Sequence, residues 1–169
     1  MNAAPDIKQT EILDAPSADF LSVYIDEQLF GIPVLQVQDV LGNQTITKIP
    51  LAPPEISGSL NLRGRIVTAV DVRCRLGLSP KGKKQKIVGV VVEYKNELYS
   101  LIIDKVGDVL TLRNETFEPS PATLDPKWQE ISQGIHQLDD ELLIILDVPK
   151  LLDSVYLQKD DNKILTDMD

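Results

Sequence analysis

The chain has 169 residues, enough for one ordinary domain or for two small units that share a core. Its hydrophobic fraction is 43% but only 5% of its residues are aromatic, so the core must be built from Val, Ile and Leu, which favours strands. The formal net charge of −9 opposes binding to nucleic acid or to anionic lipid, because both require an excess of Lys and Arg.

Both ends of the chain are acidic and lack periodic apolar spacing. Residues 1–19 hold four acids and one lysine, and residues 153–169 hold five acids and two lysines. We interpret them as a flexible N-terminal tail and a C-terminal tail, and place the folded domain at 20–152. A single cysteine, no N-terminal leader pattern and no apolar run of about 18 residues predict a cytoplasmic protein without direct membrane insertion.

The first segment of the domain predicts a β-hairpin. Residues 20–25 alternate apolar and polar side chains, residues 26–28 form a turn, and residues 29–34 return as a second strand. Pro33 confines that second strand to a sheet edge or to an irregular end. The stretch 43–54, which contains three prolines, is too rich in turn residues for regular structure.

Residues 61–73, Asn-Leu-Arg-Gly-Arg-Ile-Val-Thr-Ala-Val-Asp-Val-Arg, place charged side chains around one apolar strand. Gly64 permits a tight turn with positive φ, and residues 66–70 are suited to a buried strand. Arg63 therefore lies on a corner that the fold must hold firmly. An arginine on such a corner is well placed for recognition.

The two halves of the chain repeat one pattern. Residues 98–110 align with residues 29–41 without a gap, and five positions are identical. Residues 66–72 match residues 142–148, and the same offset places Gly58 on Gly134. Each half is therefore predicted to contain, in this order, a hairpin, a loop, a glycine, a strand, an aspartate and a short helix. We predict a mainly β protein made of two five-stranded, SH3-like barrels, roughly 20–80 and 87–152, with a groove between them; a single larger β-sandwich is the alternative.

The aspartates that follow the repeated strands predict helix caps. Asp71 is expected to cap a short helix over residues 72–76, with Gly77 as its stop. Asp147 occupies the equivalent place, and Pro149 fits the first turn of the helix that follows. A capping role explains both carboxylates more simply than a catalytic pair does.

The remaining candidates for chemistry are isolated. His136 has no nucleophile motif near it, and we interpret it as a structural or solvent-facing residue on a turn. Cys74 lies between Arg73 and Arg75, which would lower the pKa of its thiol, but a packed position on the short helix is the preferred interpretation. Trp128 is expected to pack over the seam between the barrels. The sequence thus predicts no catalytic residues, no metal site and no cofactor.

The basic run at residues 81–86 has two interpretations, a site for phosphate or an acidic partner and a solvated connector between the halves. The connector is preferred, because the run contains glycine and lacks aromatic residues. Gly58, Gly64 and Gly77 each stand alone, so no phosphate-binding loop is indicated. What remains is an interaction module in which an apolar strip is flanked by Asp39 and Arg63. The alternatives are a small-barrel nucleic-acid-binding protein, which the net charge opposes, and an enzyme with a pocket around Asp71 or Asp147.

Four segments resemble the CheW family of chemotaxis coupling proteins: residues 30–40, residues 61–73, Asp-Lys-Val-Gly-Asp-Val-Leu at 104–110, and Leu-Leu-Ile-Ile-Leu-Asp-Val-Pro-Lys-Leu-Leu at 142–152. The resemblance runs from about Phe20 to Leu152. It implies two intertwined five-stranded barrels. It also implies a cytoplasmic adaptor, recruited to membrane-associated receptor arrays, that joins the hairpin tip of chemoreceptors to the regulatory domain of the histidine kinase CheA. Contacts between copies of the coupling protein within arrays are a further implied interaction.

Carried over position by position, the resemblance implies receptor-facing roles for Val34, Val37, Asp39 and Arg63. It implies that Gly58 and Gly64 shape that surface, and that Ile46 lies in a loop that meets the kinase. Pro33 stands where the family usually has a polar or acidic residue, and Thr68 stands where proline is common. The chain is too short for CheV or CheA, which also contain this fold, so a separate coupling protein is favoured. A pathway controlling pili or another non-flagellar output is the alternative to flagellar control.

Overall fold

The structure is a computed structural model that describes residues 16–80 and 86–155. Most of both predicted tails and residues 81–85 of the basic run lie outside the described residues. The strands are β1 (Ser17–Ile25), β2 (Gln28–Pro33), β3 (Val37–Leu41), β4 (Ile56–Leu62), β5 (Arg65–Asp71), β6 (Val88–Tyr94), β7 (Glu97–Ile103), β8 (Lys105–Arg113), β9 (Phe117–Glu118), β10 (Ser132–Gln137) and β11 (Leu142–Leu146). The short helices are η1 (Val34–Gln36), α2 (Val72–Arg75), η2 (Asn114–Thr116) and α3 (Pro126–Glu130), and residues 148–155 form a final helix.

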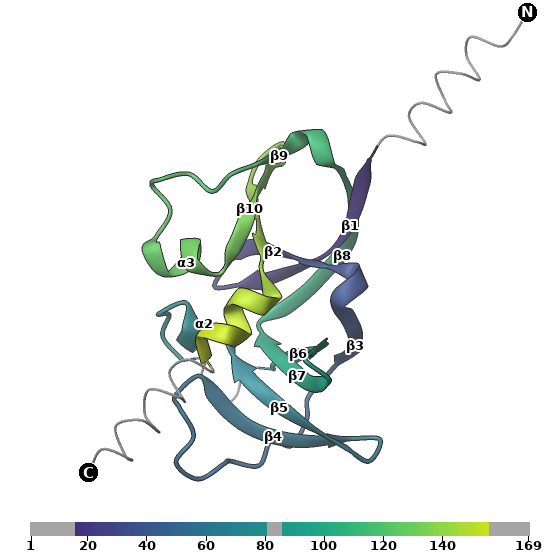
Figure 1. Cartoon of the computed structure of the whole chain (residues 1–169), viewed down its shortest axis with the longest axis vertical. Helices are drawn as coiled ribbons and strands as arrows, with labels where there is room; N and C mark the ends of the chain where they lie inside the picture. Colours follow the sequence, from purple (N-terminus) through teal and green to yellow (C-terminus); the bar gives the residue numbers. More distant parts are fainter. Residues whose placement is uncertain (1–15, 81–85, 156–169) are drawn as a thin grey trace, which may run out of the picture.

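The strands form two sheets that lie one above the other in Figure 1. The six-stranded sheet has the order β8-β1-β2-β11-β10-β9, and the five-stranded sheet has the order β3-β6-β7-β5-β4. The mainly β class with few short helices is confirmed, while closure of each sheet into an SH3-like barrel stays a prediction. The two-residue strand β9 makes the larger sheet six-stranded instead of five-stranded.

Each half of the chain contributes its hairpin to the sheet of the other half. The β1–β2 hairpin of the first half pairs with β8 and β11 of the second half. The β6–β7 hairpin of the second half pairs with β3 and β5 of the first half. Because the exchange is reciprocal, the two sheets are interleaved, as the family resemblance implied.

The repeat seen in the sequence is a repeat of local geometry. Both hairpins close through two-residue turns with positive φ at both positions, 50° and 68° at Asp26 and Glu27 and 50° and 65° at Lys95 and Asn96. Such turns match the right-handed twist of the strands. Gly58 and Gly134 lie at equivalent register shifts of β4 and β10. The chain therefore folds the same unit twice.

The two capping aspartates behave as predicted. Asp71 Oδ1 accepts a hydrogen bond from the Cys74 N–H at 3.2 Å, and Asp147 Oδ1 accepts one from the Lys150 N–H at 3.0 Å. Gly77 follows α2 with a φ of 76°, which suits a glycine stop. The final helix continues through Val155, beyond the domain end expected from the sequence.

One large apolar core is shared by both sheets. It joins Ile25, Phe30 and Ile144 of the larger sheet with Val70, Leu101 and other residues of the smaller one. The helix at 148–155 closes this core with Val148, Leu151, Leu152 and Val155, and it lies where the sheets meet in Figure 1. Trp128 packs beside the core, with its ring centroid 5.5 Å from that of Phe30, while its Nε1–H donates to the Leu76 carbonyl at 3.0 Å. Its predicted packing role at the seam between the halves is confirmed.

Candidate functional site

The surface around Arg63 and Asp39 carries the predicted charged corner. Arg63 Nη2 lies 3.4 Å from Asp39 Oδ2, so the turn between β4 and β5 is joined to strand β3. The Arg63 side chain is 84% exposed and that of Asp39 is 29% exposed. The two charges thus lie side by side, whereas the sequence analysis placed them on either side of an apolar strip. A pair this exposed contributes little to stability, so its charges are available to a partner.

The backbone around Arg63 is held in a left-handed turn. Arg63 has a φ of 53° and Gly64 a φ of 86°. Asn61 Oδ1 accepts a hydrogen bond from the Gly64 N–H at 2.9 Å, which fixes the turn from one side. Because arginine rarely adopts positive φ, the fold holds the backbone of Arg63 in a conformation that this residue disfavours.

Val34 and Val37, the predicted apolar contacts, are half-buried. Both pack against the large core. Leu35 lies between them in η1, and its residue surface is 97% exposed. Leu35 was missed because the apolar spacing of three through Val34, Val37 and Val40 skips it. The exposed apolar group at this position is therefore Leu35, while the two valines pack against the core.

Gly58 and Ile46 belong to one local arrangement. Gly58 has a φ of 149°, and a side chain there would collide with the Thr47 carbonyl oxygen. The same side chain would come within 2.8 Å of Ile46 Cγ2. Ile46 is half-buried and packs against a smaller apolar cluster under β4 and β5. Gly58 thus allows the loop before β4 to lie close to that strand, and Ile46 anchors the loop.

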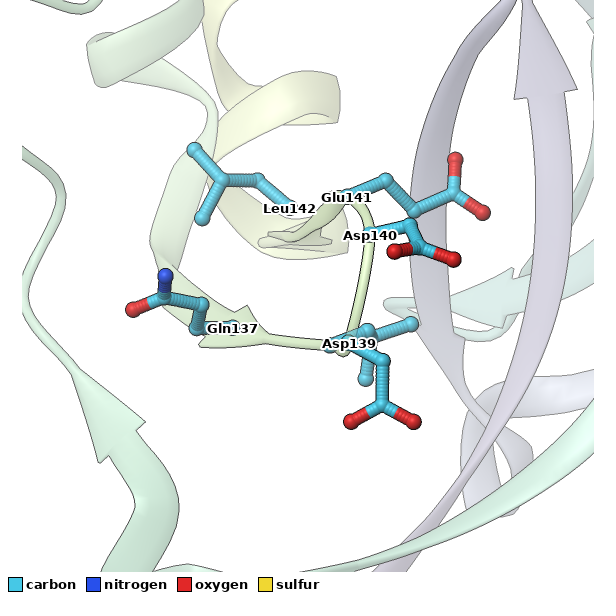
Figure 2. Close-up of a pocket in the computed structure, with 6 residues that line it drawn as sticks. Gln137, Asp139, Asp140, Glu141 and Leu142 are labelled. Carbon is cyan, nitrogen blue, oxygen red and sulfur yellow. The ribbon is translucent and has the colours of Figure 1, made fainter.

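A pocket of about 240 Å³ lies away from these residues, at the turn between β10 and β11. It is lined by Gln137, Leu138, Asp139, Asp140, Glu141 and Leu142. Figure 2 shows the carboxylate of Asp139 pointing away from those of Asp140 and Glu141. The three acids therefore do not converge on one point, and among the described residues no group of His, Cys, Asp and Glu could hold a metal ion.

His136 is buried on strand β10 and not on a turn, which corrects the sequence interpretation. It is 2% exposed, between the rings of Phe20 and Phe117 with centroids 5.6 Å away in each case. Its Nδ1 lies 3.0 Å from the hydroxyl of Thr116, and that hydroxyl donates its proton to the Arg113 carbonyl, so Nδ1–H is the donor to Thr116. Burial lowers the pKa of His136. The lowered pKa favours the neutral form of this buried imidazole.

Cys74 is half-buried on α2, as expected for a packed residue. Burial raises the pKa of its thiol, and the charges of Glu55 and Asp71 add to that effect. The neighbouring arginines do not reverse it, because Arg73 pairs with Asp104 and Arg75 with Glu130. A thiol with a raised pKa is a poor nucleophile at neutral pH.

The contact between Arg73 and Asp104 was not predicted from the sequence. Arg73 Nε lies 2.8 Å from Asp104 Oδ1, and Arg73 Nη2 lies 2.6 Å from Asp104 Oδ2. Both side chains are 16% exposed. The sequence does show opposite charges at these positions, an arginine near the end of a short helix and an aspartate at the end of an apolar strand. Because the two residues lie far apart in the sequence, no local pattern indicates that they form a pair.

Together these features define a mainly β interaction module, in which two interleaved sheets carry an exposed ion pair and, on η1, an exposed leucine. No helix of the described residues is long and apolar enough to cross a membrane. Comparison with known proteins identifies the family to which this module belongs.

Residues 19–156 match the family model of the CheW-like domain. The chain is 31% identical over 144 residues to the chemotaxis protein CheW of Klebsiella aerogenes, covering 85% of this chain and 87% of that protein. It is 28% identical to CheW of Thermotoga maritima, covering 83% and 91% of the two chains. The crystal structure of the scaffolding protein TtCheW from Thermoanaerobacter tengcongensis is similar, with a TM-score of 0.69 and 31% identity over 76% of this chain and 88% of that one.

The chain belongs to the CheW family. It is a non-enzymatic scaffold protein of chemotaxis-type signal transduction, which agrees with the function expected from the sequence.

Proposed function

We propose that this protein couples the cytoplasmic hairpin tip of chemoreceptors to the regulatory domain of a CheA-type histidine kinase, within membrane-associated receptor arrays. The observation that carries the proposal is the exposed pair of Asp39 and Arg63, which lies in the segments that resemble the family signatures and within the matched domain. Exposed charges of both signs discriminate between partners by rejecting those with mismatched charges.

The receptor-facing surface in this proposal consists of η1, β3 and the β4–β5 turn. Val34 and Val37 support it from the core side, and Asp39 and Arg63 supply its charges. Gly64 shapes it by allowing the left-handed turn that carries Arg63. A receptor tip is a helical hairpin, and an apolar surface with flanking charges suits the amphipathic face of such a helix.

The kinase-facing region in this proposal is the loop that contains Ile46. Its conformation depends on Gly58, which lets the loop approach β4. Gly58 lies on β4, the strand that leads into the Arg63 turn, so the loop and the receptor-facing surface share this strand. Copies of this protein in an array would also meet one another, which is the remaining interaction in the proposal.

Reconstitution tests the function directly. Receptor-containing membranes and the kinase are mixed with and without this protein, and phosphorylation of the kinase is followed with time. Receptor control of the kinase is expected only when the protein is present. Receptor control of the kinase that is equally strong with and without the protein would refute the proposal.

A further inference from the structure

Within the described residues the chain crosses between the two sheets at two equivalent places. It leaves the larger sheet after β2 and enters the smaller one through η1. It returns from β7 to β8 at Asp104. The sequence repeat aligns Leu35 of the first crossing with Asp104 of the second. The same point in the repeat thus carries an apolar side chain in one half and a carboxylate in the other.

At the second crossing, the Asp104 carboxylate is bound from both sheets. Arg73, on the helix that follows β5 of the smaller sheet, contacts both of its oxygens at 2.8 and 2.6 Å. The N–H of Asp26, in the β1–β2 turn of the larger sheet, donates to Asp104 Oδ2 at 2.8 Å. The Asp104 N–H donates to the Tyr24 carbonyl at 3.1 Å.

Arg73 is itself held by several contacts. Its Nη1 donates to the Ser79 carbonyl at 2.8 Å, and its Nη2 lies 3.5 Å from Asp26 Oδ1. The hydrogen bond with Asp104 raises the pKa of Arg73, so the guanidinium stays charged. A two-point contact between a guanidinium and a carboxylate fixes the angle between the groups as well as their distance.

The shared apolar core joins the two sheets by close packing. A two-point ion pair at the edge of that core adds a directional constraint on the angle between them. At the first crossing, the exposed side chain of Leu35 cannot form such a contact.

We infer that Arg73 and Asp104 form a clamp that sets the relative orientation of the two sheets, and that this orientation is needed to couple two partners. The clamp residues are positioning residues, because the contacts described above join them to Tyr24, Asp26 and Ser79, which belong to no surface assigned to partners. The second crossing therefore carries the two-point contact, whereas the first crossing carries the exposed side chain of Leu35. The coupling part of this inference rests on the proposed function, while the orientation part does not.

The orientation is measured by placing spin labels on exposed positions of the two sheets, with Glu93→Cys on β6 and Gln133→Cys on β10 in a Cys74→Ser background. Arg73→Lys keeps the charge but removes the two-point contact, and Asp104→Asn weakens it from the other side. Both changes are expected to shift or broaden the distance distribution. Arg113→Lys is the control, because Arg113 pairs with Glu115 in the segment that follows β8, so this ion pair does not join the two sheets.

Two outcomes overturn the clamp. One is an unchanged distribution in both Arg73→Lys and Asp104→Asn. The other is equal broadening in Arg113→Lys, which would mean that the loss of any arginine–carboxylate pair has this effect. Circular dichroism establishes that each variant is folded, and the shared core is expected to keep it so.

Coupling is measured in the reconstituted mixture with saturating amounts of each variant. For Arg73→Lys, receptor control of the kinase is expected to fall by about tenfold, the size of a typical coupling between sites, while each pairwise interaction stays within about twofold of wild type. Unchanged coupling in a variant with altered orientation overturns the second half of the inference. If the wild-type protein gives no coupling, the proposed function fails, and the spin-label result still decides the clamp.

Discussion

Arg63 Nη2 and Asp39 Oδ2 lie 3.4 Å apart and connect the β4–β5 turn with strand β3, although β3 and β4 are the two outer strands of the five-stranded sheet. Asp39 Oδ1 at the same time accepts the Val40 N–H at 2.8 Å, so one carboxylate holds both its own strand and the arginine. The charged corner is therefore an assembled feature of the smaller sheet, built from segments that the sequence keeps more than 20 residues apart.

Arg63→Glu is expected to weaken receptor binding without harming the fold. Two carboxylates would then face each other, but the position is so exposed that the free energy of unfolding should change by less than about 1 kcal/mol. Receptor pull-down should fall by about tenfold, as for a central interface residue. Arg65→Glu, on the neighbouring exposed position, makes the same charge change and should keep most of the binding. Equal loss in both variants would mean that only net charge matters.

Substitutions at Leu35 and Val37 distinguish an effect on receptor contact from an effect on core packing. Leu35→Ser removes a side chain that is 97% exposed, so stability should be unchanged while receptor binding weakens. Val37→Ala removes part of a side chain that packs on the core and should cost about 1–2 kcal/mol of unfolding free energy. Urea denaturation and receptor pull-down are measured on both variants. Full binding by a folded Leu35→Ser protein would remove η1 from the receptor-facing surface.

Some features of this fold and site could be predicted from the sequence, and others could not. The repeat, the capping roles of Asp71 and Asp147, and the hairpins follow from local patterns, because a cap or a turn is made by residues close in sequence. The exchange of hairpins between sheets follows from no local pattern and came only from the family resemblance. The Arg73–Asp104 contact and the burial of His136 depend on which strands become neighbours, and the sequence alone did not reveal them.

The two site glycines should respond differently to alanine. At Gly58 the φ of 149° and the collision with the Thr47 carbonyl act together, so Gly58→Ala should cost about 3 kcal/mol or more. At Gly64 there is open space around the added Cβ and only the φ of 86° is unfavourable, which costs about 1 kcal/mol. Thermal denaturation of both variants gives the comparison. Gly64→Asn, which tolerates the left-handed region, serves as the control and should lie nearer to wild type.

His136 should make the protein less stable in mild acid. Burial lowers the pKa of the folded state below the ordinary value of 6.5, whereas the imidazole of the unfolded chain keeps that value. Above about pH 7.5 both states are neutral and this residue adds no pH dependence. As the pH falls through 6.5, the unfolded state gains a proton that the folded state does not accept. The free energy of unfolding therefore decreases until the folded-state pKa is reached.

His136→Phe removes the titration while keeping a ring between Phe20 and Phe117. The Thr116 hydroxyl still donates to the Arg113 carbonyl, so the substitution leaves it with a partner. Urea midpoints are measured between pH 5.5 and 8 for both proteins, a range chosen because most carboxylates stay ionised there. The wild-type midpoint should fall towards the acid end, and the difference between the two proteins should shrink or reverse in favour of the variant. Parallel pH profiles would show that His136 is not the group responsible, since a constant offset reports packing alone.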